Sequence, residues 1–184
     1  MTAIGDWLRK LGACSEALPE FENFSRIGPG VESIKRPDWL LWFSFSQSTD
    51  EADKLRMIGA LHKLMSGPVI SALASHPEIQ KAAVQALGDT AAFVEGKPVP
   101  EAHAHHDALL QLKLPLHQKT AADLARVLLG MCLTEPGVSS GAVGSILATK
   151  WTRFLNVEGD AATLSLTQKL REVIAFQNKS EFPT

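Results

Sequence analysis

The fold is decided by the stretch Arg36-Pro37-Asp38-Trp39-Leu40-Leu41-Trp42-Phe43. Proline suits the first turn of a helix, where its missing N–H would have no partner, and the following carboxylate is favoured by the exposed N–H groups of that turn. The segment is apolar on nearly every side, and Trp39, Trp42 and Phe43 share one face, which is typical of a helix buried in a core. We therefore expect a central packing helix over residues 37 to about 47.

Helical periodicity extends from this helix toward both ends of the chain, and strand-like alternation is absent. The pattern predicts an all-α protein with a single domain over residues 1–184, built as an irregular bundle of about eight helices. Recurring helix pairs leave a partly HEAT-like stack open as an alternative, although no fixed-period repeat is visible. The polar tail, residues 178–184, is expected to fray.

Several helix ends can be predicted from local signals. A helix that starts near Asp50 is expected to end at Gly67-Pro68, with a short helical stretch after it, and Pro77 opens a long helix that ends near Gly96. Thr120-Ala121-Ala122-Asp123 resembles a capping box before a helix whose core face runs from Leu124 to Cys132. A later helix, from Ser139 or Ser140, places these apolar residues on one side: Val143, Ile146, Leu147, Trp151, Phe154 and Leu155.

Composition and charge exclude several classes of protein. The chain is 45% hydrophobic and 21% charged, with a net charge of −2, which is ordinary for a globular protein. No basic stripe of the kind that binds nucleic acid is present. No apolar run approaches the roughly 18 residues needed to span a bilayer, and the N-terminus lacks the pattern of a signal peptide. We therefore expect neither nucleic acid nor membrane as a partner.

The two cysteines, Cys14 and Cys132, are far apart in the sequence and make no disulfide framework. Cys132 lies on an apolar helix face, so we expect a small buried hydrophobic side chain. With no targeting segment, the expected location is the reducing cytoplasm. The composition does not determine the oligomeric state.

A cluster of histidines follows the stiff connector that ends at Pro100, on a helix expected to end before Pro115. On a helix His103, His106 and Asp107 stand at i, i+3 and i+4, so they share a face and could hold a zinc or iron ion, whereas His105 points elsewhere. His106-Asp107 also spells the central pair of the all-helical HD phosphohydrolases, for which His76 and Asp160 are the available further ligands. The simpler interpretation is a polar, solvated helix start without metal or cofactor, and we expect none to be bound.

Signals for other chemistry are weak. Ser139-Ser140-Gly141 is a helix start and not a nucleophile elbow, and Cys14 has no histidine near it in the sequence. His62 lies on an apolar stripe, which favours a hydrogen-bonded histidine at the core boundary. The stretch before the tryptophan helix is acidic and could be a docking edge for a basic partner. This acidic edge consists of Glu16, Glu20, Glu22 and Glu32.

The opening of the chain also resembles a family. Residues 7–18, Trp7-Leu8-Arg9-Lys10-Leu11-Gly12-Ala13-Cys14-Ser15-Glu16-Ala17-Leu18, and then Arg36-Pro37-Asp38-Trp39-Leu40-Leu41-Trp42, look like the start of bacterial helical immunity proteins of polymorphic toxin and contact-dependent competition systems. Alanine-rich helices follow in that family, as they do here. The chain departs from it at the glycine-containing loop Gly28-Pro29-Gly30 and in a less repetitive second half.

The resemblance implies a non-catalytic cytoplasmic inhibitor that binds a cognate protein toxin and blocks it sterically. The residues expected at the binding surface are Glu16, Glu20, Glu22, Glu32, His103 and His106. A metal-dependent hydrolase built on His103, His106 and Asp107 is the main alternative, and a helical adaptor or scaffold is the third.

Overall fold

The computed structural model describes residues 51–133 without a gap, together with shorter pieces of the chain. The shorter pieces are Asp6, Arg9, Lys10, Ser15, residues 18–21, Trp39, Leu41, Trp42, Ile146, Leu147, residues 149–155 and Gln168. The helices are α2 (Leu18–Phe21), α5 (Glu51–Ala72), α6 (Pro77–Val94), α7 (Ala102–Asp107) and α8 (Leu116–Leu133), and residues 149–155 are helical as well. The described part of the chain contains no strand, which confirms the all-α prediction there.

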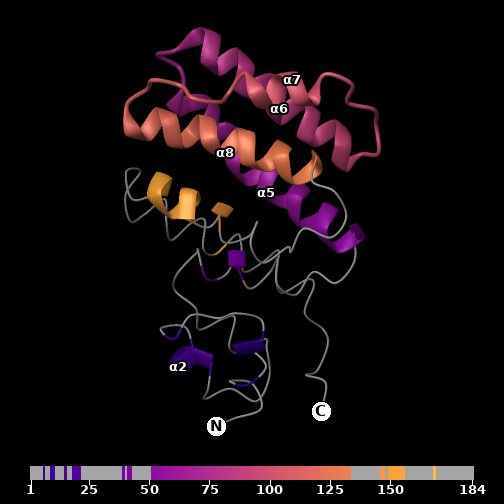
Figure 1. Cartoon of the computed structure of the whole chain (residues 1–184), viewed down its shortest axis with the longest axis vertical. Helices are drawn as coiled ribbons and strands as arrows, with labels where there is room; N and C mark the ends of the chain where they lie inside the picture. Colours follow the sequence, from indigo (N-terminus) through magenta and orange to yellow (C-terminus); the bar gives the residue numbers. More distant parts are fainter. Residues whose placement is uncertain are drawn as a thin grey trace.

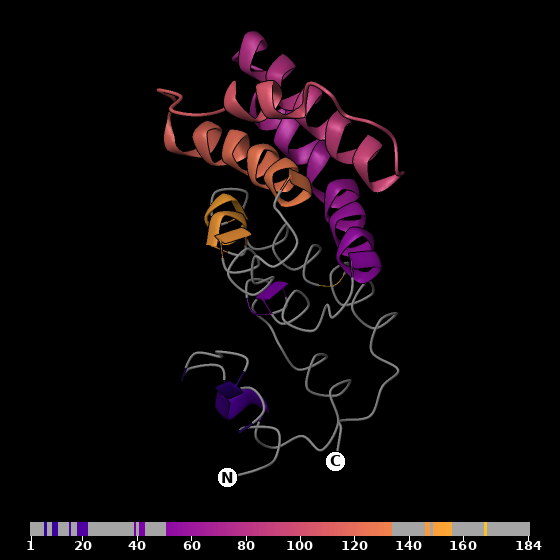
Figure 2. The same cartoon turned by 45° about the vertical axis from the view of Figure 1, so that its right-hand side comes forward.

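The three long helices form the centre of the structure. Helices α5, α6 and α8 each contact the other two, and the short helix α7 contacts α6 and α8. In Figures 1 and 2, α6 and α7 lie on one side of α8, while residues 149–155 lie on the other side. Helix α8 therefore contacts both other long helices and α7, and it also contacts residues 149–155.

The core is built from one stripe on each long helix. On α5 the buried side chains are Met57, Ile58, Leu61, Met65 and Val69, at the spacing that places them on one helical face. On α8 almost every turn contributes to the core. The buried residues of α8 are Thr120, Ala121, Ala122, Leu124, Ala125, Val127, Leu128, Leu129, Met131 and Cys132.

Alanines line the contact between the helices. Ala83 and Ala86 of α6 and Ala121 and Ala125 of α8 have no accessible surface. A methyl side chain lets two helix axes approach closely, so backbone atoms and larger neighbouring side chains come into van der Waals contact. Larger side chains at these fully buried positions would force the surrounding structure to shift.

Within the segment 36–47, the structure describes three residues, Trp39, Leu41 and Trp42. Trp39 and Leu41 are helical and buried in the core, and Trp42 packs against it while half-buried. These positions confirm the expected packing role of the two tryptophans. The other residues of 36–47 lie outside the described part of the chain.

Helix α6 has the ends that its sequence predicts. Pro77 occupies the first turn, where it costs no hydrogen bond. At the other end Gly96 adopts a left-handed φ of 73°, its N–H donates to Phe93 O at 2.9 Å, and the N–H of Lys97 donates to Ala92 O at 2.9 Å. This pair of bonds is a Schellman motif, and it satisfies two carbonyls that the helix would leave open.

The predicted end of α5 at Gly67-Pro68 is wrong, because the helix continues through both residues to Ala72. Pro68 has no N–H to give to the carbonyl of Leu64, and a proline inside a helix costs about 3 kcal/mol. Gly67 and Pro68 are exposed to solvent, whereas Met65 before them and Val69 after them in the helix are fully buried. The buried residues before and after Pro68 therefore keep α5 helical through the proline.

The predicted start of α8 at Thr120 is also wrong. The helix begins at Leu116, and the N–H of Lys119 donates to Pro115 O at 2.9 Å. Thr120 is a buried interior residue whose hydroxyl donates to Leu116 O at 2.7 Å, one turn back. A threonine can satisfy its hydroxyl in this way inside a helix, so the apparent capping box is not a cap.

One further expectation needs correction. Ile146 is 52% exposed, because on a helix it lines up with Lys150 and Arg153, whereas Leu147 lines up with the buried Trp151 and Phe154. The histidine helix ends at Asp107, before Pro115 as expected. Val143, Ser139 and Ser140 lie outside the described residues.

We predict that Pro68→Ala stabilises the protein by about 1–3 kcal/mol. Alanine restores an N–H to the interior of α5 at a position that faces solvent. Pro77→Ala is the matched control, since its proline sits in the first turn of α6 and its replacement should change the free energy of unfolding by less than about 0.5 kcal/mol. Urea denaturation of both variants measures the difference. Equal shifts at the two positions would contradict the continuous α5.

Candidate functional site

The acidic edge lies outside the part of the chain that the structure describes. Glu16, Glu22 and Glu32 are not among the described residues, and Glu20 is described only as part of the backbone of α2. Cys14 and Asp160 also lie outside. The histidine-bearing helix α7 is described in full, so its geometry can be set against the sequence-based hypotheses.

Helix α7 is one and a half turns long and is anchored by its first residue. Ala102 is buried, and its N–H donates to Val99 O at 3.2 Å, which joins the helix to the proline-rich connector before it. The N–H of His105 donates to Glu101 O at 3.0 Å and that of Ala108 to Ala104 O at 2.9 Å. So short a helix is not stable alone, and side chains must hold it against α6 and α8.

His105 makes the closest of these contacts. Its Nδ1 lies 2.6 Å from Oδ2 of Asp89 on α6, and its Nε2 lies 3.6 Å from Oε2 of Glu101. The side chains of His105 and Asp89 are both largely shielded from solvent. From its place in the sequence, His105 is expected to point away from the other histidines. It does point away from them, toward a carboxylate on another helix, and sequence spacing alone gave no signal of that partner.

His106 packs on α8. Its Nδ1 lies 3.0 Å from Oδ1 of Asp107, and its Nε2 lies 3.5 Å from an Nη atom of Arg126. If Nε2 accepts from the guanidinium, the proton sits on Nδ1, which can donate to the carboxylate. A Cβ atom at Gly130 would lie 3.4 Å from this Nε2, at van der Waals contact, so the imidazole packs directly beside Gly130 of α8.

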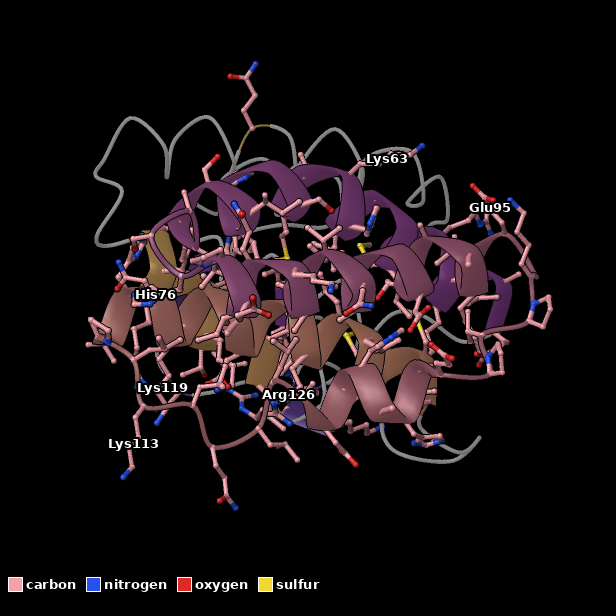
Figure 3. The ribbon with its side chains drawn as sticks, turned by 90° about the horizontal axis from the view of Figure 1, so that it is seen from above. Lys63, His76, Glu95, Lys113, Lys119 and Arg126 are labelled. Carbon is pink, nitrogen blue, oxygen red and sulfur yellow. The ribbon has the colours of Figure 1, made fainter. Side chains whose placement is uncertain are left out.

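The proposed ligand face His103, His106 and Asp107 does not form a ligand set. His103 is exposed, and His106 is directed toward α8. Over the described residues, no group of three or more His, Cys, Asp or Glu side chains is arranged to hold a metal ion. His76, the upstream ligand that the HD alternative needs, lies at the other end of α6, well separated from α7 in Figure 3.

A second polar cluster ties α8 to residues 149–155. Asp123 of α8 accepts from Lys150, and its other oxygen lies 3.7 Å from Nε of Arg126. In the same region the ring of His117 stacks on Phe154 with a centroid distance of 4.7 Å, and Trp151 packs on Phe154 at 5.9 Å. Arg126 therefore connects Asp123 with His106, and Figure 3 shows it beside α7. These contacts are structural, since they join helices.

Two remaining candidates behave as the sequence predicted. Burial raises the pKa of the Cys132 thiol to about 12, so it stays protonated at neutral pH and is a poor nucleophile. Burial lowers the pKa of His62, although a hydrogen bond to the backbone of Leu87 opposes the shift. His62 is then a neutral, half-buried boundary histidine.

No family model, curated protein or solved structure matches this chain. The resemblance of its opening motifs to immunity proteins therefore remains a prediction. Within the described ranges, no helix combines the length and the apolar character that crossing a membrane requires.

We predict that His105→Ala lowers the free energy of unfolding by about 1–3 kcal/mol, because it leaves the shielded Asp89 carboxylate without its partner. His103→Ala, at an exposed position on the same helix, is the control and should be nearly neutral. Urea denaturation at neutral pH compares them. If both variants were as stable as the parent protein, the His105–Asp89 contact would not be what holds α7 in place.

Proposed function

We propose that this chain is an immunity protein, built as an irregular bundle of about eight helices, that binds a cognate bacterial toxin in the cytoplasm and blocks it sterically. The observation that carries the proposal is the pair of opening motifs, residues 7–18 and Arg36–Trp42, which resemble the start of helical immunity proteins. The proposed action is inhibition by binding, without turnover of a substrate.

The packing of the described helices supports this proposal. A steric inhibitor works best as a preorganised body, because flexible partners lose conformational entropy when they bind. The fully buried alanines between α6 and α8 and the stripe of large apolar residues on α5 make such a body. His105 of α7 and Asp123 of α8, which could otherwise carry chemistry, are used in contacts between helices.

The proposed contact residues differ in how available they are. His103 is exposed on α7 and can reach a partner. His106 is half-buried against α8, so its proposed contribution is to hold α7 in place while α7 is bound. The acidic edge, Glu16, Glu20, Glu22 and Glu32, stays a proposed docking edge for basic groups of the toxin.

Co-expression tests the proposal. We predict that the protein abolishes killing by the toxin candidate encoded in the neighbouring reading frame, and that calorimetry of the two purified proteins detects a one-to-one complex. Unimpaired killing in cells that contain the folded protein, together with no heat of binding, would favour the adaptor or hydrolase hypothesis instead.

The same complex tests the acidic edge. Reversing Glu20 and Glu22 to lysine should slow association, more at low salt than at high salt, because electrostatic steering is screened by ions. Glu78→Lys, at the exposed start of α6, is the control for a charge change elsewhere.

A further inference from the structure

The connector between α7 and α8 exposes leucines beside lysines. Leu116 is 62% exposed and Leu110 is 42% exposed, and over the described residues only Val84 and Ile146 are large apolar side chains of similar exposure. The neighbouring leucines are turned toward the core: Leu109 is buried, and Leu112 and Leu114 pack against the core. The connector is thus fixed to the core by some leucines and presents others to solvent.

The backbone of the connector has an unusual conformation at Gln111. Gln111 has a φ of 52°, and over the described residues it is the only non-glycine residue with a positive φ. Such a conformation costs about 1 kcal/mol or more in an L-residue and persists where the surrounding structure fixes it. It lies directly after Leu110, whose N–H is bound to Asp107 O at 3.0 Å. This turn therefore holds Leu110 in its exposed position.

The same segment is positively charged. From Ala108 to Ala122 the sequence contains Lys113 and Lys119 and no Asp or Glu. Both lysines are exposed, and within the described residues neither is paired with a carboxylate. Figure 3 shows both at the same end of the helical body, projecting outward. Leu116 and Lys119 stand three apart on the first turn of α8, so they share a face.

We propose that Leu110, Lys113, Leu116 and Lys119, the leucine–lysine edge, dock onto an acidic surface of the cognate toxin. This inference rests on the proposed function and adds the chemistry of the partner. Carboxylates of the toxin face the two lysines, and an apolar recess between them receives Leu116. An exposed apolar patch rimmed by polar residues is a recognised mark of a protein interaction site, and the two lysines add an electrostatic preference for acidic groups.

Other occupants fit the edge less well. A second copy of this chain that paired through the same edge would place lysines opposite lysines, which is unfavourable. An anionic membrane gains only about 1 kcal/mol per lysine near its surface, so two lysines and two leucines make a weak anchor. A folded acidic partner satisfies the charges and the apolar side chains together.

The test uses the full-length protein and the purified toxin candidate from the neighbouring reading frame. The Lys113→Glu/Lys119→Glu variant should slow association about tenfold or more at low salt, with a smaller effect at high salt, because like charges then meet. The Leu116→Ser variant should speed dissociation about tenfold or more, as expected when an interfacial apolar anchor is lost. Both sites are exposed, and circular dichroism checks that the variants remain folded.

Matched controls lie on other faces. Val84→Ser removes a comparably exposed apolar side chain from α6, and Lys63→Glu/Lys81→Glu reverses two exposed lysines of α5 and α6. These variants should associate and dissociate within about twofold of the parent protein.

The possible outcomes separate the inference from the function on which it rests. If the parent protein binds and protects, and the edge variants bind as well as it does, the inference is wrong and the proposed function stands. If the parent protein neither binds nor protects, both are wrong. Loss of self-association in light scattering, or loss of binding to vesicles of anionic phospholipid, as the sole effect of the edge variants would also overturn the assignment to a toxin.

Discussion

The close contact of α8 with α5 and α6 is the constraint on which the rest of the described structure depends. Buried alanines on α6 and α8 let the helices approach, and the stripe of methionine, leucine and isoleucine on α5 fills the remaining volume. Packing of this density responds to the addition of a single methylene group. It also explains why α5 remains helical through Pro68, since the residues on either side of the proline are fixed in this contact.

The surface features are attached to this centre through α8. One side of α8 receives α7, through His106 beside Gly130 and Arg126, and α6 holds α7 through the His105–Asp89 contact. Asp123 with Lys150, and His117 with Phe154, join α8 to residues 149–155. The connector that exposes Leu110 and Leu116 runs directly into the first turn of α8. The proposed binding groups are therefore presented by short segments held on a rigid helix.

Much of this architecture could be predicted from local sequence signals. The ends of α6 follow from Pro77 and Gly96, and the buried face of α8 follows from helical spacing between Leu124 and Cys132. Expectations based on a single residue were less reliable. Pro68 predicts a helix end because a proline inside a helix is costly, yet the burial of Met65 and Val69 outweighs that cost. Thr120 is a residue type typical of helix caps, yet its hydroxyl donates to the carbonyl of Leu116 one turn back.

The candidate site was less predictable than the fold because its contacts cross between helices. Nothing in the local sequence links His105 to Asp89, 16 residues earlier, or His106 to Arg126, 20 residues later. The helical spacing of His103, His106 and Asp107 was correctly identified, but the spacing does not show that the imidazole of His106 turns toward α8. Leu110 lies directly before the turn at Gln111, for which the sequence carries no glycine signal.

Native-state hydrogen exchange tests the central role of α8 most directly. Interior amides of α8, such as those of Leu124 and Leu128, should exchange only through global unfolding, with the same free energy that urea denaturation gives. The amides of His105 and Ala108, which are bonded within and just after α7, should exchange at a lower free energy because local opening of α7 exposes them. Exchange of the α8 amides as fast as those of α7 would contradict a fold built around α8.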